Sequence, residues 1–292
     1  CETASIRVVI TSRVFEKKAG FTLPENCRVI YLEDVRQQIT RGEKIRGLLE
    51  GNFLHLRLLE KALGRQRPAR LDDLATLVFS SGSTGIPKGV MLTHWNIMSN
   101  CLGAQQVVGL ERTNPRFLGI LPFFHSFGYM AVFWLPVTKG LGVSYYPNPL
   151  DARAIGETVE RDRVTHLFAT PTFLSAYMRR VEPGQFGSLT FVLTGAEKLR
   201  EGLVKAFSER FGIAPVEGYG CTECSPVVSL NGTDYRAPGY FQAGGRLGTV
   251  GQPIPGVTSR VIDLQTEEEL PPGEEGMLLI RGANIMAGYS RD

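Results

Sequence analysis

The feature that most constrains the fold is a regular alternation, from residue 74 onward, of short β-rich segments with longer helix-forming segments. The predicted strands are 74–80 (LATLVFS), 117–121 (FLGIL), 142–147 (GVSYYP), 165–170 (THLFAT), 189–195 (LTFVLTG) and 214–220 (APVEGYG). The predicted helices are 93–108, 126–139, 151–161 with Asp151 as N-cap, a helix beginning at Pro171, and 200–211. This alternation predicts βαβ units in a mainly parallel sheet, with ligands bound beyond the carboxyl ends of the strands.

The two ends of the chain differ from this middle part. RVVIT (7–11) and RVIYL (28–32) predict two further strands, and 43–63 predicts one amphipathic helix. After about residue 238 the sequence is β-rich with Gly-Pro turns, and the acidic run 266–276 predicts a solvated hairpin turn. We therefore predict an α/β fold with mainly parallel sheets flanked by helices over 1–237, followed by a smaller β subdomain over 238–292.

Composition excludes several classes of function. The chain is 43% hydrophobic and 21% charged, which is ordinary for a globular protein. A net charge of +3 is too small for a general nucleic-acid binder, so no nucleic-acid partner is expected. Five cysteines at irregular spacing argue against a disulfide scaffold and for a reducing compartment. The expected location is the cytoplasm or the cytoplasmic face of a membrane.

The most apolar window, 117–137, is a candidate for a membrane span. A spanning helix needs about 20 consecutive apolar residues. Here Pro122, His125, Ser126 and Gly128 interrupt the run. A strand, a loop and a buried helix explain the window better, and no transmembrane segment is predicted.

Segment 79–89, FSSGSTGIPKG, has the composition of a phosphate-binding loop directly after a predicted strand. Glycines let the backbone turn tightly and direct N–H groups inward, four hydroxyls add donors, and Lys88 adds a positive charge. Anionic phosphates are held by such groups. It is not a Walker P-loop, because that pattern needs Gly-Lys followed by Ser or Thr, whereas Pro87 and Gly89 flank Lys88.

Several motifs in one order resemble those of the adenylate-forming (AMP-binding) superfamily, which includes acyl-CoA synthetases, adenylation domains and luciferases. They are FSSGSTGIPKGV (79–90), LTGAE (193–197), EGYGCTE (217–223), GTVGQPIPG (248–256) and GMLLIRGANIMAGY (276–289). Together with LPFFHSFG (121–128) and CSPVVSLN (224–231), they look most like the synthetase part of the bifunctional acyl-acyl carrier protein synthetase/2-acylglycerophosphoethanolamine acyltransferases.

The resemblance implies a two-step reaction. A fatty acid is activated with ATP and Mg²⁺ to an acyl-AMP, with release of pyrophosphate, and the acyl group then passes to a thiol of acyl carrier protein or CoA. A link to lysophospholipid acylation at the membrane is expected for the longer protein.

The resemblance also implies roles for individual residues. The β- and γ-phosphates are expected at Ser81, Gly82, Ser83, Thr84, Gly85 and Lys88. The nucleotide's adenine side is expected at Gly195, Ala196, Glu197, Tyr219 and Gly220. Thr222 is expected at the α-phosphate, and Thr84 and Glu223 beside Mg²⁺. His125 is expected to orient the carboxylate or to contact the developing charge, so that His125, Thr84, Lys88 and Glu223 form the catalytic set.

The choice of acid rests on the sequence around His125. The segment FFHSFGYMAVFW carries no acidic residue, whereas amino-acid-activating relatives place an Asp near this position. A fatty acid is therefore favoured over an amino acid. An adenylation domain for an aryl or amino acid, and a non-catalytic nucleotide-binding relative, stay open as alternatives.

Some of the family's parts are not in the sequence. The Y-x-T-G-D motif, the hinge and the small C-terminal domain with its catalytic lysine are expected after the GY of 288–289, and Gly276-Met277-Leu278 stands where Gly-Glu-Leu is usual. We therefore expect a core part of the enzyme, truncated at both ends, with little or no adenylation activity by itself.

Two segments invite a different reading. Segment 41–70 carries eight Lys/Arg and three Glu, which favours a helix with a solvated basic face; the alternative is a docking surface for acyl carrier protein or anionic lipid.

The C-x-x-C pair Cys221 and Cys224 suggests a metal or redox site. No second Cys/His pair stands at zinc-like spacing, so the sequence predicts that the cysteines are incidental.

Overall fold

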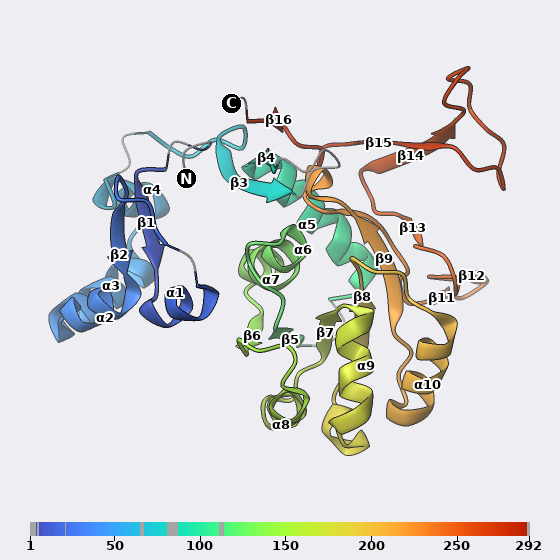
Figure 1. The fold of residues 1–292 in the computed structure, drawn as a ribbon, viewed down its shortest axis with the longest axis horizontal. Helices are drawn as coiled ribbons and strands as arrows, with labels where there is room; N and C mark the ends of the chain where they lie inside the picture. The colour runs from blue at the N-terminus through green and yellow to red at the C-terminus, as the bar shows by residue number, and fades with distance from the viewer. Residues whose placement is uncertain are drawn as a thin grey trace. The chain divides into compact units, whose positions relative to one another are not determined.

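The computed structural model describes residues 4, 6–20, 22–64, 67–80, 87–110 and 114–290 (Figure 1). The chain divides into two compact units, Cys1–Asp73 with Ser290–Asp292, and Leu74–Tyr289. Each unit is described by itself below. The predicted division at 237/238 stays a prediction.

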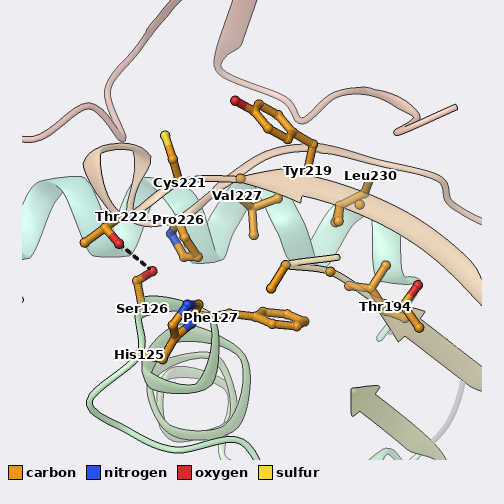
Figure 2. A pocket seen from close by; sticks show the side chains of 15 residues that line it. His125, Ser126, Phe127, Thr194, Tyr219, Cys221, Thr222, Pro226, Val227 and Leu230 are labelled. Carbon is orange, nitrogen blue, oxygen red and sulfur yellow. Dashed lines mark hydrogen bonds between the residues drawn. The ribbon is translucent and has the colours of Figure 1, made fainter. Parts of the chain in front are cut away.

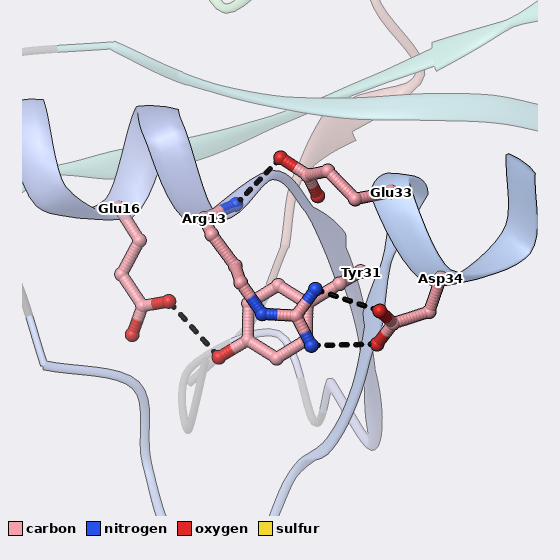
Figure 3. A network of polar contacts seen from close by, with 5 residues as sticks. All are labelled: Arg13, Glu16, Tyr31, Glu33 and Asp34. Carbon is pink, nitrogen blue, oxygen red and sulfur yellow. Dashed lines mark hydrogen bonds and ion pairs between the residues drawn. The ribbon is translucent and has the colours of Figure 1, made fainter. Parts of the chain in front are cut away.

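The first unit contains the two predicted strands, β1 (Val8–Thr11) and β2 (Arg28–Tyr31), which pair in parallel. Its helices are α1 (Arg13–Ala19), α2 (Leu32–Gln38), α3 (Arg41–Phe53) and α4 (Leu56–Ala62). A polar network joins α1 to β2 and α2 (Figure 3). Arg13 donates to both carboxylate oxygens of Asp34 at 2.7 Å, and its guanidinium lies 4.2 Å from the centroid of the Tyr31 ring.

The prediction of one helix over 43–63 is wrong. The chain is extended at Leu54 and His55, which separates α3 from α4. In the last turn of α3 the Asn52 side chain donates to the Leu48 carbonyl oxygen at 2.7 Å, and the His55 side chain accepts from the Arg57 N–H as the N-cap of α4. No residue of α3 or α4 is buried.

The second unit is built on a seven-stranded sheet in the order β13-β10-β9-β8-β7-β5-β6. Its strands are β5 (Arg116–Gly119), β6 (Gly142–Tyr145), β7 (His166–Ala169), β8 (Phe191–Thr194), β9 (Val216–Gly220), β10 (Val227–Leu230) and β13 (Gln252–Pro253). The five strands from β6 to β9 are parallel, and β10 and β13 are antiparallel to their neighbours. The predicted α/β class with a mainly parallel sheet is confirmed.

Helices cover both faces of this sheet (Figure 1). They are α5 (His94–Val108), α6 (Ser126–Tyr129), a π-helical turn (Met130–Trp134), α7 (Leu135–Lys139), α8 (Ala152–Asp162), α9 (Pro171–Arg180) and α10 (Glu201–Phe211). Side chains alternate along the strands. Phe117 and Phe168 join the core beneath α5–α7, whereas Leu118 and Leu167 join the core beneath α8–α10. Burial on both faces explains why these strands are almost wholly apolar.

Caps fix where several helices begin. The Asp151 carboxylate accepts from the Ala154 N–H at 3.2 Å, which confirms the predicted N-cap of α8. Pro171 occupies the first turn of α9, as predicted. Thr93 and Asn96 form a reciprocal capping box at the start of α5.

A second sheet carries the segment after the glycine-rich loop. It has the order β16-β4-β3, with β3 (Leu74–Ser80), β4 (Lys88–Thr93) and β16 (Gly288–Tyr289) all antiparallel. The sequence predicted a loop leading directly into a helix, and strand β4 was missed. Val90 and Leu92 point into the core at 0% and 1% exposure, so tertiary burial stabilises β4 as a strand.

The C-terminal part is β-rich, as predicted. Short strands β11 (Tyr235–Ala237) and β12 (Tyr240–Gln242) pair, and β14 (Val257–Ile262) pairs antiparallel with β15 (Met277–Gly282). The acidic run 266–276 lies in the connection of this last hairpin. The apolar window 117–137 holds a strand, a loop and a helical segment, and no described helix is long and apolar enough to cross a membrane.

His166 is a buried titratable group in the central sheet. Its side chain is 2% exposed, stacks on Phe117 with centroids 5.2 Å apart, and has Nδ1 2.8 Å from the Thr165 hydroxyl. Burial lowers the pKa of His166 to about 4, from an ordinary value of 6.5. The folded protein therefore holds this imidazole neutral.

We predict that His166 makes stability fall with acidity. The unfolded chain takes up the proton near pH 6.5 and the folded chain only near pH 4, so the contribution is complete above pH 6.5 and is lost as pH falls toward 4. Its size is about 3 kcal/mol. Urea unfolding followed by tryptophan fluorescence should show less pH dependence in His166→Phe than in the wild type. Equal pH dependence in both proteins would contradict the assignment.

Candidate functional site

A pocket of about 240 Å³ opens at the carboxyl ends of β8 and β9, with α6 forming its opposite wall (Figure 2). Its lining residues are His125, Ser126, Phe127, Leu193, Thr194, Gly195, Ala196, Gly218, Tyr219, Gly220, Cys221, Thr222, Pro226, Val227 and Leu230. The location is the one that parallel strands predict for a ligand, because several loops meet at this edge. Six of the residues singled out in the sequence line it together: His125, Gly195, Ala196, Tyr219, Gly220 and Thr222.

One side of the pocket is formed by backbone and an aromatic ring. Gly195 and Ala196 follow β8 immediately, and Ala196 has a left-handed φ of 67°. The Tyr219 ring is 39% exposed, which leaves a face free for a planar group. Glu197 does not line the pocket; its carboxylate accepts from the Thr172 hydroxyl at 2.6 Å and so joins the loop after β8 to α9.

The other side of the pocket carries hydroxyls and an imidazole. The hydroxyls of Ser126 and Thr222 lie 3.2 Å apart and point toward one another (Figure 2). His125 is the N-cap of α6, where its Nδ1 accepts from the Phe127 N–H at 3.3 Å. Partial desolvation lowers the pKa of His125, so its ring is neutral at pH 7. With Nδ1 used as an acceptor, Nε2 carries the proton and can donate to an anion.

The turn after β9 is held from two directions. Asn100 on α5 is fully buried, and its amide N–H groups reach the carbonyl oxygens of Cys224 and Val227 at 3.1 and 2.7 Å. Asn284, after β15, donates to the same two carbonyls at 2.8 and 3.1 Å. The Ser225 hydroxyl donates back to the Asn284 carbonyl at 2.8 Å. These bonds fix the position of Thr222 and Glu223.

Glu223 meets Tyr289 of β16 and Met286, which lies just before that strand. The Tyr289 hydroxyl donates to its carboxylate at 3.1 Å, and the Met286 N–H donates to its backbone oxygen at 2.8 Å. Lys88 lies over the Tyr289 ring, with Nζ 5.3 Å from the centroid. The pairing of β16 with β4 creates this group. Sequence reasoning found Lys88 and Glu223 but missed Tyr289 and Ser126, although both lie inside motifs that it had singled out.

The other predicted phosphate-loop residues, Ser81, Gly82, Ser83, Thr84 and Gly85, lie outside the described residues. Lys88 stands at the start of β4, directly after that loop. The phosphate-binding role of these residues therefore stays a prediction.

The side chains that could act as metal ligands suit one kind of metal ion. Within the described part of the chain, no three His, Cys, Asp or Glu side chains gather closely enough to hold a metal. Glu223 supplies a single half-buried carboxylate. That fits Mg²⁺, which is commonly bound by one or two carboxylates with substrate phosphates and water completing its shell, and it does not fit a zinc site.

Comparison with known proteins identifies the family. Residues 1–290 match the family model "AMP-binding enzyme", and the chain belongs to that family. It is 33% identical to a feruloyl-CoA synthase of Amycolatopsis sp over 224 residues, which is 76% of this chain and 43% of that protein. It is 29% identical to a probable 4-coumarate–CoA ligase 3 of Dictyostelium discoideum over 97% of this chain and 52% of that protein.

A third relative and two solved structures extend the comparison. A long-chain-fatty-acid–CoA ligase of Bacillus subtilis is 30% identical, over 74% of this chain and 38% of that protein. ATP-bound MatB from Rhodopseudomonas palustris has a TM-score of 0.74 at 24% identity, over 98% of this chain and 52% of that one. O-succinylbenzoate coenzyme A synthetase from Bacillus subtilis, in complex with ATP and magnesium ion, has a TM-score of 0.74 at 21% identity, over 100% of this chain and 54% of that one. The chain spans about half the length of the curated relatives it matches.

We predict that Gly220→Ala damages the pocket. A Cβ at Gly220 would overlap the carbonyl of Pro226, on the opposite side of the turn, so β9 and the turn must separate. AMP affinity measured by calorimetry should fall about tenfold or more. The matched control is Gly202→Ala in α10, where an added Cβ meets no atom within 4 Å. Equal affinity in the two variants would show that AMP does not use this pocket.

Proposed function

We propose that the protein is an acid–thiol ligase that activates a carboxylic acid with ATP and then transfers the acyl group to a thiol. The observation that carries the proposal is one pocket with two chemically different sides. An aromatic ring and a backbone edge suit adenine, and the hydroxyl and imidazole side suits the α-phosphate and the carboxylate. Membership of the AMP-binding enzyme family supports the same assignment.

In the first step a carboxylate oxygen attacks the α-phosphorus of ATP. The bond from that phosphorus to the bridging oxygen of the β-phosphate breaks, and pyrophosphate leaves. The neutral His125 and the hydroxyls of Ser126 and Thr222 donate to the oxygens where negative charge gathers. No general base is needed, because the carboxylate is ionised at pH 7. In the second step a thiolate sulfur attacks the acyl carbon, and AMP leaves.

Lys88 and Glu223 act at the triphosphate end of the nucleotide, away from the adenine. Lys88 supplies a cation beside the phosphate loop, and Glu223, oriented by Tyr289, would hold Mg²⁺ together with Thr84. When bound, Mg²⁺ neutralises charge on the phosphates. Tyr289 restrains both side chains, because its ring faces Lys88 and its hydroxyl bonds Glu223.

We propose a fatty acid as the substrate. Apolar side chains, including Leu193, Val227 and Leu230, line the same pocket as His125, and no Asp or Glu lies among the lining residues. A long-chain-fatty-acid–CoA ligase among the relatives supports this choice. The motif resemblance adds a finer proposal: acyl carrier protein as an acceptor beside CoA, and a cytoplasmic, membrane-associated role in lysophospholipid acylation.

An aryl acid is the second candidate. Two relatives are named for coumarate and ferulate, which are flat and compact acids. The apolar lining residues, among them Phe127 and Leu230, suit an aryl ring as well as an aliphatic chain.

ATP–pyrophosphate exchange by the full-length protein decides between these candidates. We expect exchange with fatty acids, weaker exchange with aryl acids, and none with amino acids. Acyl transfer is then measured to CoA and, separately, to acyl carrier protein. Preference for an aryl acid would transfer the proposal to that substrate class, and exchange with no acid in the panel would refute an acid ligase.

We predict that Glu223→Gln weakens ATP–Mg²⁺ binding much more than binding of AMP without metal. The amide keeps an acceptor for Tyr289 but removes the charge that Mg²⁺ requires, which should cost about tenfold or more in ATP–Mg²⁺ affinity. Calorimetry with each nucleotide measures the difference. The matched control is Glu209→Gln on the exposed surface of α10. An equal loss for both nucleotides would assign Glu223 a structural role and not a metal-binding one.

A further inference from the structure

The two cysteines after β9 form a close pair of thiols. The Sγ atoms of Cys221 and Cys224 lie 3.3 Å apart, and both residues are free cysteines. Their side chains meet because the residues between them form a single 3-10 turn, Thr222–Cys224, in which the Cys224 N–H bonds the Cys221 carbonyl oxygen at 3.0 Å. The sequence alone suggested an incidental pair, and the geometry brings the sulfurs nearly into bonding range.

The two cysteines flank residues of the proposed nucleotide site. Cys221 is half-buried and lines the pocket, so a small molecule can reach it, whereas Cys224 is 3% exposed. Thr222 and Glu223 lie between the two sulfurs along the chain. Figure 2 shows the Cys221 sulfur on the same side of the backbone as the Tyr219 ring and opposite to the Thr222 hydroxyl. Along the chain Cys221 stands between Tyr219 and Thr222, which line the two sides of the pocket.

Both ends of the turn are anchored through the backbone, and at the first end the Cys221 N–H donates to the Pro226 carbonyl oxygen at 2.9 Å. The Cys224 carbonyl accepts from Asn100 and Asn284, both of which are buried. A disulfide has its sulfurs about 2.05 Å apart, so the pair must close by about 1.2 Å from its 3.3 Å separation. Because the backbone is anchored at both Cys221 and Cys224, the closure must distort the turn between them. The segment that moves carries Thr222 and Glu223.

We propose that Cys221 and Cys224 are a thiol-modification site, in which a low-molecular-weight disulfide such as glutathione disulfide oxidises the pair and so weakens nucleotide binding. The regulatory part rests on the proposed nucleotide site. Formation of the bond shifts Thr222 from Ser126, 3.2 Å away, and Glu223 from Tyr289, 3.1 Å away. The hydroxyl donor to the α-phosphate and the carboxylate proposed to hold Mg²⁺ are then misplaced.

The chemistry balances as two thiol–disulfide exchanges. The Cys221 sulfur attacks glutathione disulfide, its S–S bond breaks, and one glutathione leaves as the thiol with the proton that Cys221 gave up. The Cys224 sulfur then attacks the Cys221 sulfur of the mixed disulfide and releases the second glutathione. Two cysteine thiols are oxidised, and one glutathione disulfide is reduced to two thiols. The buried Cys224 needs no access to solvent, because its partner is already within reach.

The 292-residue chain is equilibrated with reduced and oxidised glutathione at a series of ratios. Peptide mass mapping should find the loss of two hydrogens in the peptide that contains Cys221 and Cys224. Cys101, which is 2% exposed on α5, should stay a thiol and serves as the internal control. AMP affinity, measured by calorimetry, should be about tenfold weaker in the oxidised chain and should recover with dithiothreitol.

The comparison uses the variants Cys221→Ala and Cys224→Ala. For each variant, the AMP affinity after treatment with oxidised glutathione is divided by the AMP affinity of the same variant in its reduced form. Neither variant can form the internal bond, so both ratios should be near one. The regulation is refuted if the wild type forms the disulfide without losing affinity, or if Cys224→Ala loses as much through glutathione attached at Cys221. Absence of the internal disulfide at every ratio refutes the modification site itself. A reduced chain that binds no AMP would instead overturn the proposed nucleotide site, while mass mapping still decides whether the dithiol is oxidised.

Discussion

The carboxamide of Asn100 holds the chain at the point where it leaves the central sheet and enters the site. After β9 the backbone turns sharply, and Cys224 and Val227 are both buried. Asn100 from α5 and Asn284 from beyond β15 donate to the carbonyl oxygens of both. A buried carbonyl left without a donor costs about 1–3 kcal/mol, so this arrangement is strongly specified. The positions of Thr222 and Glu223 depend on it.

The same arrangement links the site to the rest of the Leu74–Tyr289 unit. The pairing of β16 with β4 brings Tyr289 to Lys88, which lies 201 residues earlier (289 − 88), and to Glu223, which lies 66 residues earlier. Both ends of the turn are anchored through the backbone, and Thr222 between them lines the pocket. Anchored ends make the turn precise as a binding element, and they also make it responsive to a bond between Cys221 and Cys224.

Local sequence signals predicted much of the fold because they act over short distances. The N-cap at Asp151, the proline at the start of α9 and the apolar runs of β5, β7 and β8 each carry their own physical cause. Predictions failed where tertiary contacts decided the outcome. Strand β4 exists because Val90 and Leu92 are buried, and the predicted helix 43–63 breaks at the extended residues Leu54 and His55, where the His55 side chain caps the next helix.

By itself the sequence determined the α/β class, the place of the pocket at the strand ends, and six residues that line it, since motif order and hydrophobic periodicity are properties of the chain read in one dimension. Tertiary structure alone decided that Tyr289 meets Glu223, that Ser126 faces Thr222, that Glu197 turns away toward Thr172, and that two cysteine sulfurs lie 3.3 Å apart. These contacts depend on strand register and on buried amide bonds between distant segments, and no local pattern encodes the distance between two side chains.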